Sequence, residues 1–264
     1  MLMQETKMKF ILLFYLIPFT IYSQIVIAPN DYTSTAGGGF VPEDLSPYIN
    51  LVHNTGVTID GTSGRVTAWT DGESFDNGTD VNRPFPTASG MLFHQDTLKY
   101  LALADNGANG LDVGTSDFSV EFWLQYTAAG AQRIYHNTGS NPHIRIVGQD
   151  NDGIRFSFNF YNPGGDSIAN LTSTTVLTDA ALHHWVVVVD RNVGAYLYLD
   201  GAIDVTEETT EWTNLAWVNM NNTNFTTIGR ADGGLGFGYL KVLRQFPSAL
   251  TAGNVSDLFD YGSE

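Results

Sequence analysis

Apolar residues occupy every second position of one nine-residue segment, Phe118–Tyr126, and this pattern limits the fold more than any other feature of the sequence. Only an extended backbone places alternate side chains on one face, so the segment predicts a β-strand that lies against a core. A second run, Ile154–Phe160, alternates in the same way and follows a turn-forming sequence at Asp150–Gly153. Residues His143–Phe160 are therefore predicted to form a β-hairpin.

Further strands and turns fill the second half of the chain. The continuous apolar run Trp185–Val189 indicates a strand buried on both faces. Turn sequences at Asp190–Gly194 and Asp200–Gly201 follow it, and a last long strand is predicted over Gly236–Arg244. Only Thr251–Phe259 has a helical pattern. The short strands, about a dozen, predict an all-β fold of two antiparallel sheets packed as a sandwich, with one short C-terminal helix.

The cysteine and charge content exclude several classes of function. The chain has no Cys, which rules out a disulfide scaffold, a thiolate metal site and a thiol nucleophile. It has 12 Lys and Arg against 28 Asp and Glu, a net charge of -16. Such an excess argues against nucleic acid or an anionic membrane as the partner, because a polyanion is bound by clustered cations. A neutral or cationic ligand, or bound Ca²⁺, is compatible with it.

Residues 1–23 are interpreted as a secretory signal peptide. Lys7 and Lys9 precede an apolar run, Phe10–Ile21, that is too short to span a bilayer. The alternative is a retained anchor helix. The ending Tyr22–Gln24 resembles signal peptides of the Bacteroidota. We therefore expect a bacterial protein that is secreted, periplasmic or held at the cell surface.

The remainder of the chain is predicted to contain one domain. Residues 24–50 are rich in Gly, Pro, Ser and Thr and are expected to form an irregular arm. Residues 51–264 carry the strand signals without a linker-like break, so they are assigned to a single β-domain.

Four segments in order resemble the laminin-G-like domains of the concanavalin A-like lectin/glucanase superfamily, namely Phe118–Trp123, Trp185–Gly201, Thr227–Gly229 and Gly238–Thr251. The second contains an apolar strand after Trp185 and a return strand that ends in Leu-Asp-Gly, as in a hairpin typical of these domains. The resemblance implies a jelly roll of two antiparallel sheets. It also implies structural roles for Trp185 in the core and for Gly201 and Gly229 at strand turns.

A catalytic site is not predicted. The glucanases that the chain resembles carry carboxylates in a Glu-x-Asp-x-x-Glu spacing, because retaining hydrolysis needs an acid and a nucleophile about 5–5.5 Å apart. That spacing is missing, and Glu207–Glu211 lacks its central Asp. His183 and His184 have no zinc-binding spacing and are interpreted as structural residues at a strand edge. Arg145 and Arg155, which could face each other across the predicted hairpin, leave a polysaccharide lyase open as an alternative.

Calcium is the one cofactor for which the sequence offers candidates. Relatives in this superfamily often bind Ca²⁺ through an Asp near the closing strand, and the resemblance places Lys241 at that position. We expect the Lys241 ammonium to replace the cation there, or else to point to solvent. Two loops dense in carboxylate and amide oxygens are further candidates, although such sequences also form ordinary turns. Their candidate ligands are Asp105, Asn106, Asp112, Asp76 and Asp80.

Aromatic side chains close to amides are the candidates for ligand binding. A sugar ring offers apolar C–H faces to an aromatic ring and hydroxyl groups to amides and carboxylates. The candidates are Trp212, Trp217, Tyr161, Tyr135, Asn219 and Asn221. The alternative is that these rings cover the edge of the sandwich.

The function predicted from these features is that of an exported, non-catalytic module that binds a glycan or a cell-surface partner. Two alternatives stay open. One is a polysaccharide-active enzyme, a glycoside hydrolase or lyase, whose site is not recognisable from sequence. The other is a structural or adhesion subunit without a small ligand.

Overall fold

Two antiparallel β-sheets make up most of the chain that the computed structural model describes. The described residues are 40–47, 49–53, 55–63, 65–71, 73–76, 84–93, 100–103, 113–127, 132–137, 143–150, 154–161, 167–177, 179–207, 219, 226–229 and 237–263. All of them lie in one unit, Phe40–Glu264. Among them, no helix has both the length and the apolar character needed to cross a bilayer.

The first sheet has eight strands in the order β15-β14-β13-β8-β17-β6-β5, with β1 paired to β17. Its strands are β1 (Ile49–Val52), β5 (Phe85–Thr87), β6 (Gly90–Phe93), β8 (Phe118–Tyr126), β13 (His183–Asp190), β14 (Gly194–Leu199), β15 (Ala202–Glu207) and β17 (Gly238–Phe246). The expected irregular arm over residues 24–50 thus ends earlier than predicted, because β1 begins at Ile49 and a short 3-10 helix, η1, spans Pro42–Leu45.

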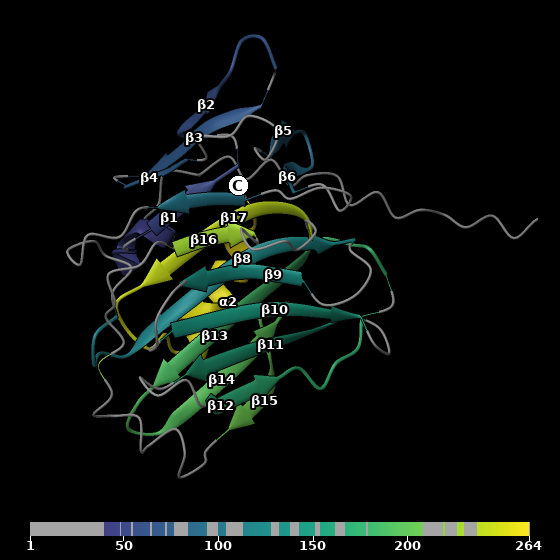
Figure 1. Cartoon of the computed structure of the whole chain (residues 1–264). Helices are drawn as coiled ribbons and strands as arrows, with labels where there is room; N and C mark the ends of the chain where they lie inside the picture. The colour runs from purple at the N-terminus through teal and green to yellow at the C-terminus, as the bar shows by residue number, and fades with distance from the viewer. Residues whose placement is uncertain are drawn as a thin grey trace, which may run out of the picture. The chain divides into compact units, whose positions relative to one another are not determined.

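The second sheet has nine strands in the order β12-β11-β10-β9-β16-β7-β4-β3-β2. Its strands are β2 (Val57–Ile59), β3 (Val66–Asp71), β4 (Glu73–Asp76), β7 (Tyr100–Leu103), β9 (Gln132–Asn137), β10 (His143–Asp150), β11 (Ile154–Tyr161), β12 (Ser167–Thr172) and β16 (Thr226–Gly229). In Figure 1, β9, β10 and β11 cross in front of β13 and β14 of the eight-stranded sheet. The predicted two-sheet sandwich is confirmed.

The main core lies between the two sheets. Phe118 and Phe122 of β8 are fully buried on one side of it, and Phe158 of β11 is buried on the other. The rings of Phe118 and Phe158 meet across the core, with 6.1 Å between their centroids. Trp69 and Trp185 are both completely buried in the same cluster, which confirms Trp185 as a core residue. The alternation seen in the sequence therefore does assign one face of β8 to the core.

A second apolar layer covers the other face of the eight-stranded sheet. Helix α2 (Ala252–Tyr261) is capped by Thr251, whose hydroxyl oxygen accepts a hydrogen bond from the Asn254 backbone N–H at 3.1 Å. Its buried residues pack against the outer face of β13. Phe259 lies parallel to the Trp123 ring, with the centroids 5.8 Å apart. Because of this cover, β8 is buried on both faces and not on one alone.

A two-residue turn between β14 and β15 lies against the same helix. Asp200 and Gly201 have φ values of 49° and 77°, the left-handed pair that tight hairpin turns require. A Cβ atom on Gly201 would lie 3.0 Å from the Phe259 ring. Glycine is therefore needed here both for the turn and for the close approach of α2.

Candidate functional site

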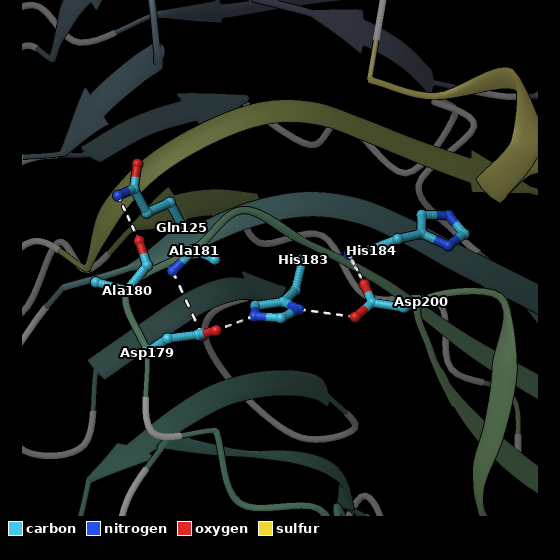
Figure 2. A network of polar contacts seen from close by, with 7 residues as sticks. All are labelled: Gln125, Asp179, Ala180, Ala181, His183, His184 and Asp200. Atoms are coloured by element: carbon cyan, nitrogen blue, oxygen red, sulfur yellow. Dashed lines mark hydrogen bonds and ion pairs between the residues drawn. The ribbon is translucent and has the colours of Figure 1, made fainter. Parts of the chain in front are cut away.

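A charged histidine lies at the point where β13 begins. His183 Nδ1 is 2.8 Å from Asp200 Oδ2, and His183 Nε2 is 2.9 Å from Asp179 Oδ1 (Figure 2). Asp200 belongs to the β14–β15 turn, whereas Asp179 comes from the loop before β13. The hydrogen bond to Asp200 is the main reason that the pKa of His183 rises to about 9; burial opposes the rise and Asp179 adds to it. His183 is therefore an imidazolium at neutral pH, and both its N–H groups donate.

Further hydrogen bonds connect this cluster to neighbouring elements. The backbone N–H of His184 donates to Asp200 Oδ1 at 3.0 Å. Gln125, at the end of β8, donates its side-chain N–H to the Ala180 carbonyl in the loop (Figure 2). Burial opposes ionisation of Asp200, but its hydrogen bonds from His183 and His184 hold its pKa below the ordinary value. The cluster joins the loop, β8 and the β14–β15 turn, and a histidine charged at neutral pH is not available there as a general base.

A buried ionic cluster lies next to it, beneath helix α2. Arg244 Nη1 is 3.1 Å from both carboxylate oxygens of Glu121, and His184 Nε2 is 3.2 Å from Glu121 Oε1. Burial opposes ionisation of Glu121, yet the Arg244 charge and the two hydrogen-bonding partners hold its pKa below the usual range. Arg244 also donates through Nε to Asn50 Oδ1 at 2.7 Å, and Asn50 donates to Glu43 at 2.7 Å. This chain of contacts connects β8 and β17 to β1 and η1.

The sequence patterns did not predict this second cluster. The only signal for it was an acidic residue, Glu121, in the middle of a largely apolar strand. Its side chain is completely buried and is matched by Arg244 and His184, so it is not open to a substrate. The arrangement supports the sheet and its helix and provides no accessible acid or base.

The face of the nine-stranded sheet that points away from the core carries a row of polar residues. Tyr135, Ile146 and Phe158 are register partners on β9, β10 and β11 and are buried in the core. Strand alternation places their neighbours on the opposite face. Successive register partners there form one row across seven strands: Asn170, Asn159, Arg145, His136, Thr227, Ala102 and Asp76. Asn170 is exposed at one end, whereas His136 and Thr227 are buried in the middle.

The predicted ligand-binding residues fall in different places. Tyr135 is 2% exposed, and its hydroxyl donates to Gln245 Oε1 of the opposite sheet at 3.0 Å, so its ring is part of the core and not a surface platform. Tyr161 ends β11, and Asn219 is exposed. Trp212, Trp217 and Asn221 lie outside the described residues.

The predicted calcium ligands are mostly untested by the structure. Asp76 is the last residue of β4 and belongs to the polar row. Asp105, Asn106, Asp112 and Asp80 lie outside the described residues. In the described part of the chain, no group of three or more His, Asp or Glu residues is arranged to hold a metal ion.

Lys241 and the two predicted turn glycines are all placed by the structure. The partly buried Lys241 donates from Nζ to Ser263 Oγ at 3.5 Å, after helix α2. Burial and the Lys241 charge together lower the pKa of His53. Gly229 ends β16 with φ 80°, and Gly201 forms the turn described above, so both glycines occupy positions where a left-handed backbone is required.

An antiparallel two-sheet sandwich closed by one helix is the architecture of lectin-like domains. Residues 95–256, more than half of the chain, match the laminin G model of the Concanavalin A-like lectin/glucanases superfamily. The chain belongs to this superfamily. No curated protein matches it.

Several solved structures share the fold. The binding domain of botulinum neurotoxin serotype G is 14% identical, with a TM-score of 0.61 over 81% of this chain and 51% of that one. The serotype D ligand-binding domain in complex with N-acetylneuraminic acid is 10% identical, with a TM-score of 0.59 over 83% and 52%. The binding domain of Paraclostridial Mosquitocidal Protein 1 is 12% identical, with a TM-score of 0.54 over 75% and 52%. This chain spans about half the length of those proteins, and the likeness is one of fold.

Proposed function

We propose that this protein is an exported, non-catalytic carbohydrate-binding module whose binding surface is the outer face of the nine-stranded sheet. The observation that carries the proposal is the polar row across that face, in which the amide residues Asn170 and Asn159, the guanidinium residue Arg145 and the carboxylate residue Asp76 occupy register positions on either side of the buried His136 and Thr227. A sugar presents a ring of hydroxyl groups that both donate and accept, and such groups match that mixture.

The charged clusters of the eight-stranded sheet favour a binding role over hydrolysis. Retaining hydrolysis requires two carboxyl groups about 5–5.5 Å apart that face a substrate. Glu121 is sealed in the interior by Arg244 and His184, and Asp179 and Asp200 are held by a protonated His183. These carboxylates therefore form ion pairs that stabilise the fold.

The comparisons support a binding role in a general way. The structures that share the fold are described as binding domains, and one of them is a complex with N-acetylneuraminic acid, a sugar. Export through a signal peptide at residues 1–23 would bring such a module to extracellular glycans.

The proposal is tested by a glycan-array screen with the purified protein and a matched pair of variants. The variant Asn159→Ala/Asn170→Ala removes two amides from the polar row, whereas Asn192→Ala removes one from the exposed β13–β14 turn. We expect the wild type and Asn192→Ala to bind the same glycans and the double variant to lose at least tenfold in affinity. Absence of glycan binding by the wild type, or equal binding by all three proteins, would overturn the proposal.

The same screen is repeated in a chelator to address calcium. Ca²⁺ binds through six to eight oxygen ligands, and the loops that contain Asp105 and Asp80 are its candidates. We propose that glycan binding at the sheet face does not depend on them. Loss of binding in the chelator alone would instead assign the site to a calcium loop.

A further inference from the structure

The positive charges of this acidic chain are not spread evenly over it. The chain has 12 Lys and Arg against 28 Asp and Glu. Two of the arginines, Arg191 and Arg244, are buried and held by internal contacts. Three others, Arg133, Arg145 and Arg155, fall on the adjacent strands β9, β10 and β11. A quarter of the cations therefore lies on three neighbouring strands of one sheet.

Strand register places these three arginines on the same face. Arg145 pairs with His136 and Asn159, Arg133 pairs with Val147, and Arg155 pairs with Gln149. All these positions alternate with the core row of Tyr135, Ile146 and Phe158. Neighbouring strands lie about 4.8 Å apart and successive residues of a strand about 3.4 Å apart, so the three arginine backbones fall within about 15 Å of one another.

A β-bulge is needed to bring Arg133 to this face. The pairing of β9 with β10 shifts between Ile146 and Val147, so that Ile134 has no partner in the register. Without the shift, Arg133 and Tyr135 would share a face, because they are two residues apart. With it, Tyr135 stays in the core while Arg133 lies on the outer face.

Among the described residues, the outward-facing register positions beside the arginines hold no carboxylate. On the described strands β7, β9, β10, β11, β12 and β16, the register positions that face away from the core contain no Asp or Glu. His136 and His143 are at such positions, and the first carboxylate reached along the row is that of Asp76 on β4. In a chain of net charge -16, these outward-facing register positions therefore combine three arginines with no carboxylate.

We infer that the glycan bound by this sheet face is anionic and carries carboxylate or sulfate groups that the strip of Arg133, Arg145 and Arg155 recognises. This inference rests on the proposed function and names its ligand class. A guanidinium donates two parallel hydrogen bonds to a carboxylate or sulfate, and the amides of the same row are available for the hydroxyl groups. The net charge suggested a neutral or cationic ligand, but the strand register places three arginines on one face, and an anionic ligand requires such a group of cations.

Other polyanions fit the strip less well. Duplex nucleic acid and an anionic membrane present charge over a wide area, which the acidic remainder of the chain would repel. A short anionic glycan needs only a few matched contacts on one face of a sheet. Its sugar hydroxyl groups also form hydrogen bonds with the asparagines of the row, which binding to a lipid surface does not require.

The test measures affinity for anionic probes and their neutral forms. Tetragalacturonate is compared with its methyl ester, and a sulfated carrageenan tetrasaccharide with its desulfated form, by calorimetry at two salt concentrations. We expect binding of one or both anionic probes, at least tenfold weaker binding of the neutral form, and weakening by salt. The two pairs separate carboxylate recognition from sulfate recognition.

Charge-removing variants assign the effect to the strip. Arg145→Gln and Arg133→Gln/Arg155→Gln are expected to lose at least tenfold in affinity, whereas Arg65→Gln, which removes the same charge next to Phe85 at β5, is expected to bind as the wild type does. Melting temperatures show whether each variant folds. If a variant does not fold, the salt dependence of glycan binding by the wild type still tests whether the ligand is recognised by its charge.

The outcomes separate this inference from the proposed function. Equal affinity for charged and neutral probes would overturn the anionic ligand and leave carbohydrate binding intact. No binding of any glycan would overturn both. Binding of duplex DNA or of phosphatidylglycerol vesicles as tightly as the anionic glycans would overturn the glycan assignment. Loss of affinity in Arg65→Gln equal to that in Arg145→Gln would overturn the assignment to the strip.

Discussion

Arg244 and Glu121 form an ion pair inside the protein, with Arg244 Nη1 3.1 Å from each carboxylate oxygen and both side chains at most 2% exposed. The two residues are direct register partners on β17 and β8. They lie on the face of the eight-stranded sheet that α2 covers, so the helix seals a charged pair together with apolar side chains. Arg244 also bonds Asn50, and the same pair therefore fixes β1 and η1 to the sheet.

Removing one partner of this pair is expected to destabilise the protein strongly. Arg244→Met leaves the buried Glu121 carboxylate without its main counter-charge, and a loss of about 3–5 kcal/mol is typical of such a change. The double variant Glu121→Leu/Arg244→Met removes both charges and is expected to recover most of that loss. Urea unfolding of the wild type, both single variants and the double variant gives the coupling energy. Additive losses would contradict a coupled pair.

The His183 cluster predicts a loss of stability at alkaline pH. The pKa of His183 is about 9 in the folded protein and 6.5 ordinarily, so the folded state binds the proton more tightly. This contribution is fully present below pH 6.5 and is lost as the pH rises to about 9. A shift of this size corresponds to at most about 3 kcal/mol.

Two measurements check this pH dependence. Urea unfolding between pH 5.5 and 9.5 should show the decline in the wild type and a much flatter profile in His183→Gln. The pKa values of Asp179 and Asp200 are lowered, so these two carboxylates also stabilise the folded state, but with the opposite pH dependence. Their contribution is present above the ordinary value of 3.8 and is lost as the pH falls below it. An NMR titration that places the pKa of His183 near 6.5 would contradict the ion-paired imidazolium.

Much of the fold was predictable, because local patterns decide it. The alternation in Phe118–Tyr126, the apolar run after Trp185 and the Thr251 cap each act within a few residues, and each is confirmed. The pattern did not show that Trp123 would be buried, because its cover, Phe259, is far away in the sequence.

The candidate sites were less predictable, because they depend on register between distant strands. Glu121 meets Arg244 across two strands that are 123 residues apart in sequence. Arg133 reaches the outer face only through a bulge, which no residue type announced. Tyr135 looked like a surface residue in a polar stretch, but its register pairing with the buried Ile146 places it in the core. Composition gives the sign of the net charge, whereas the register of the strands decides where the few positively charged residues come together.

Gly201 is expected to tolerate no side chain. Its φ of 77° is strained for alanine, and an added Cβ would lie 3.0 Å from the Phe259 ring. Gly201→Ala should therefore lower the free energy of unfolding by about 1–3 kcal/mol. The matched control is Gly61→Ala, because nothing lies within 4 Å of a Cβ there and no left-handed φ is required. Equal stability of the two variants in urea would show that α2 does not approach the turn so closely.

Tyr135→Phe separates a core residue from a ligand-binding one. The hydroxyl of Tyr135 crosses the core to Gln245 at 3.0 Å, and it is buried at the centre of the sandwich. Its removal is expected to cost about 1 kcal/mol of stability. Glycan affinity should stay within twofold of the wild type, because the ring faces the eight-stranded sheet while Arg145 and Asn159 lie on the other face. Calorimetry and urea unfolding on the same preparation measure both quantities. A loss of affinity with unchanged stability would return Tyr135 to the binding site.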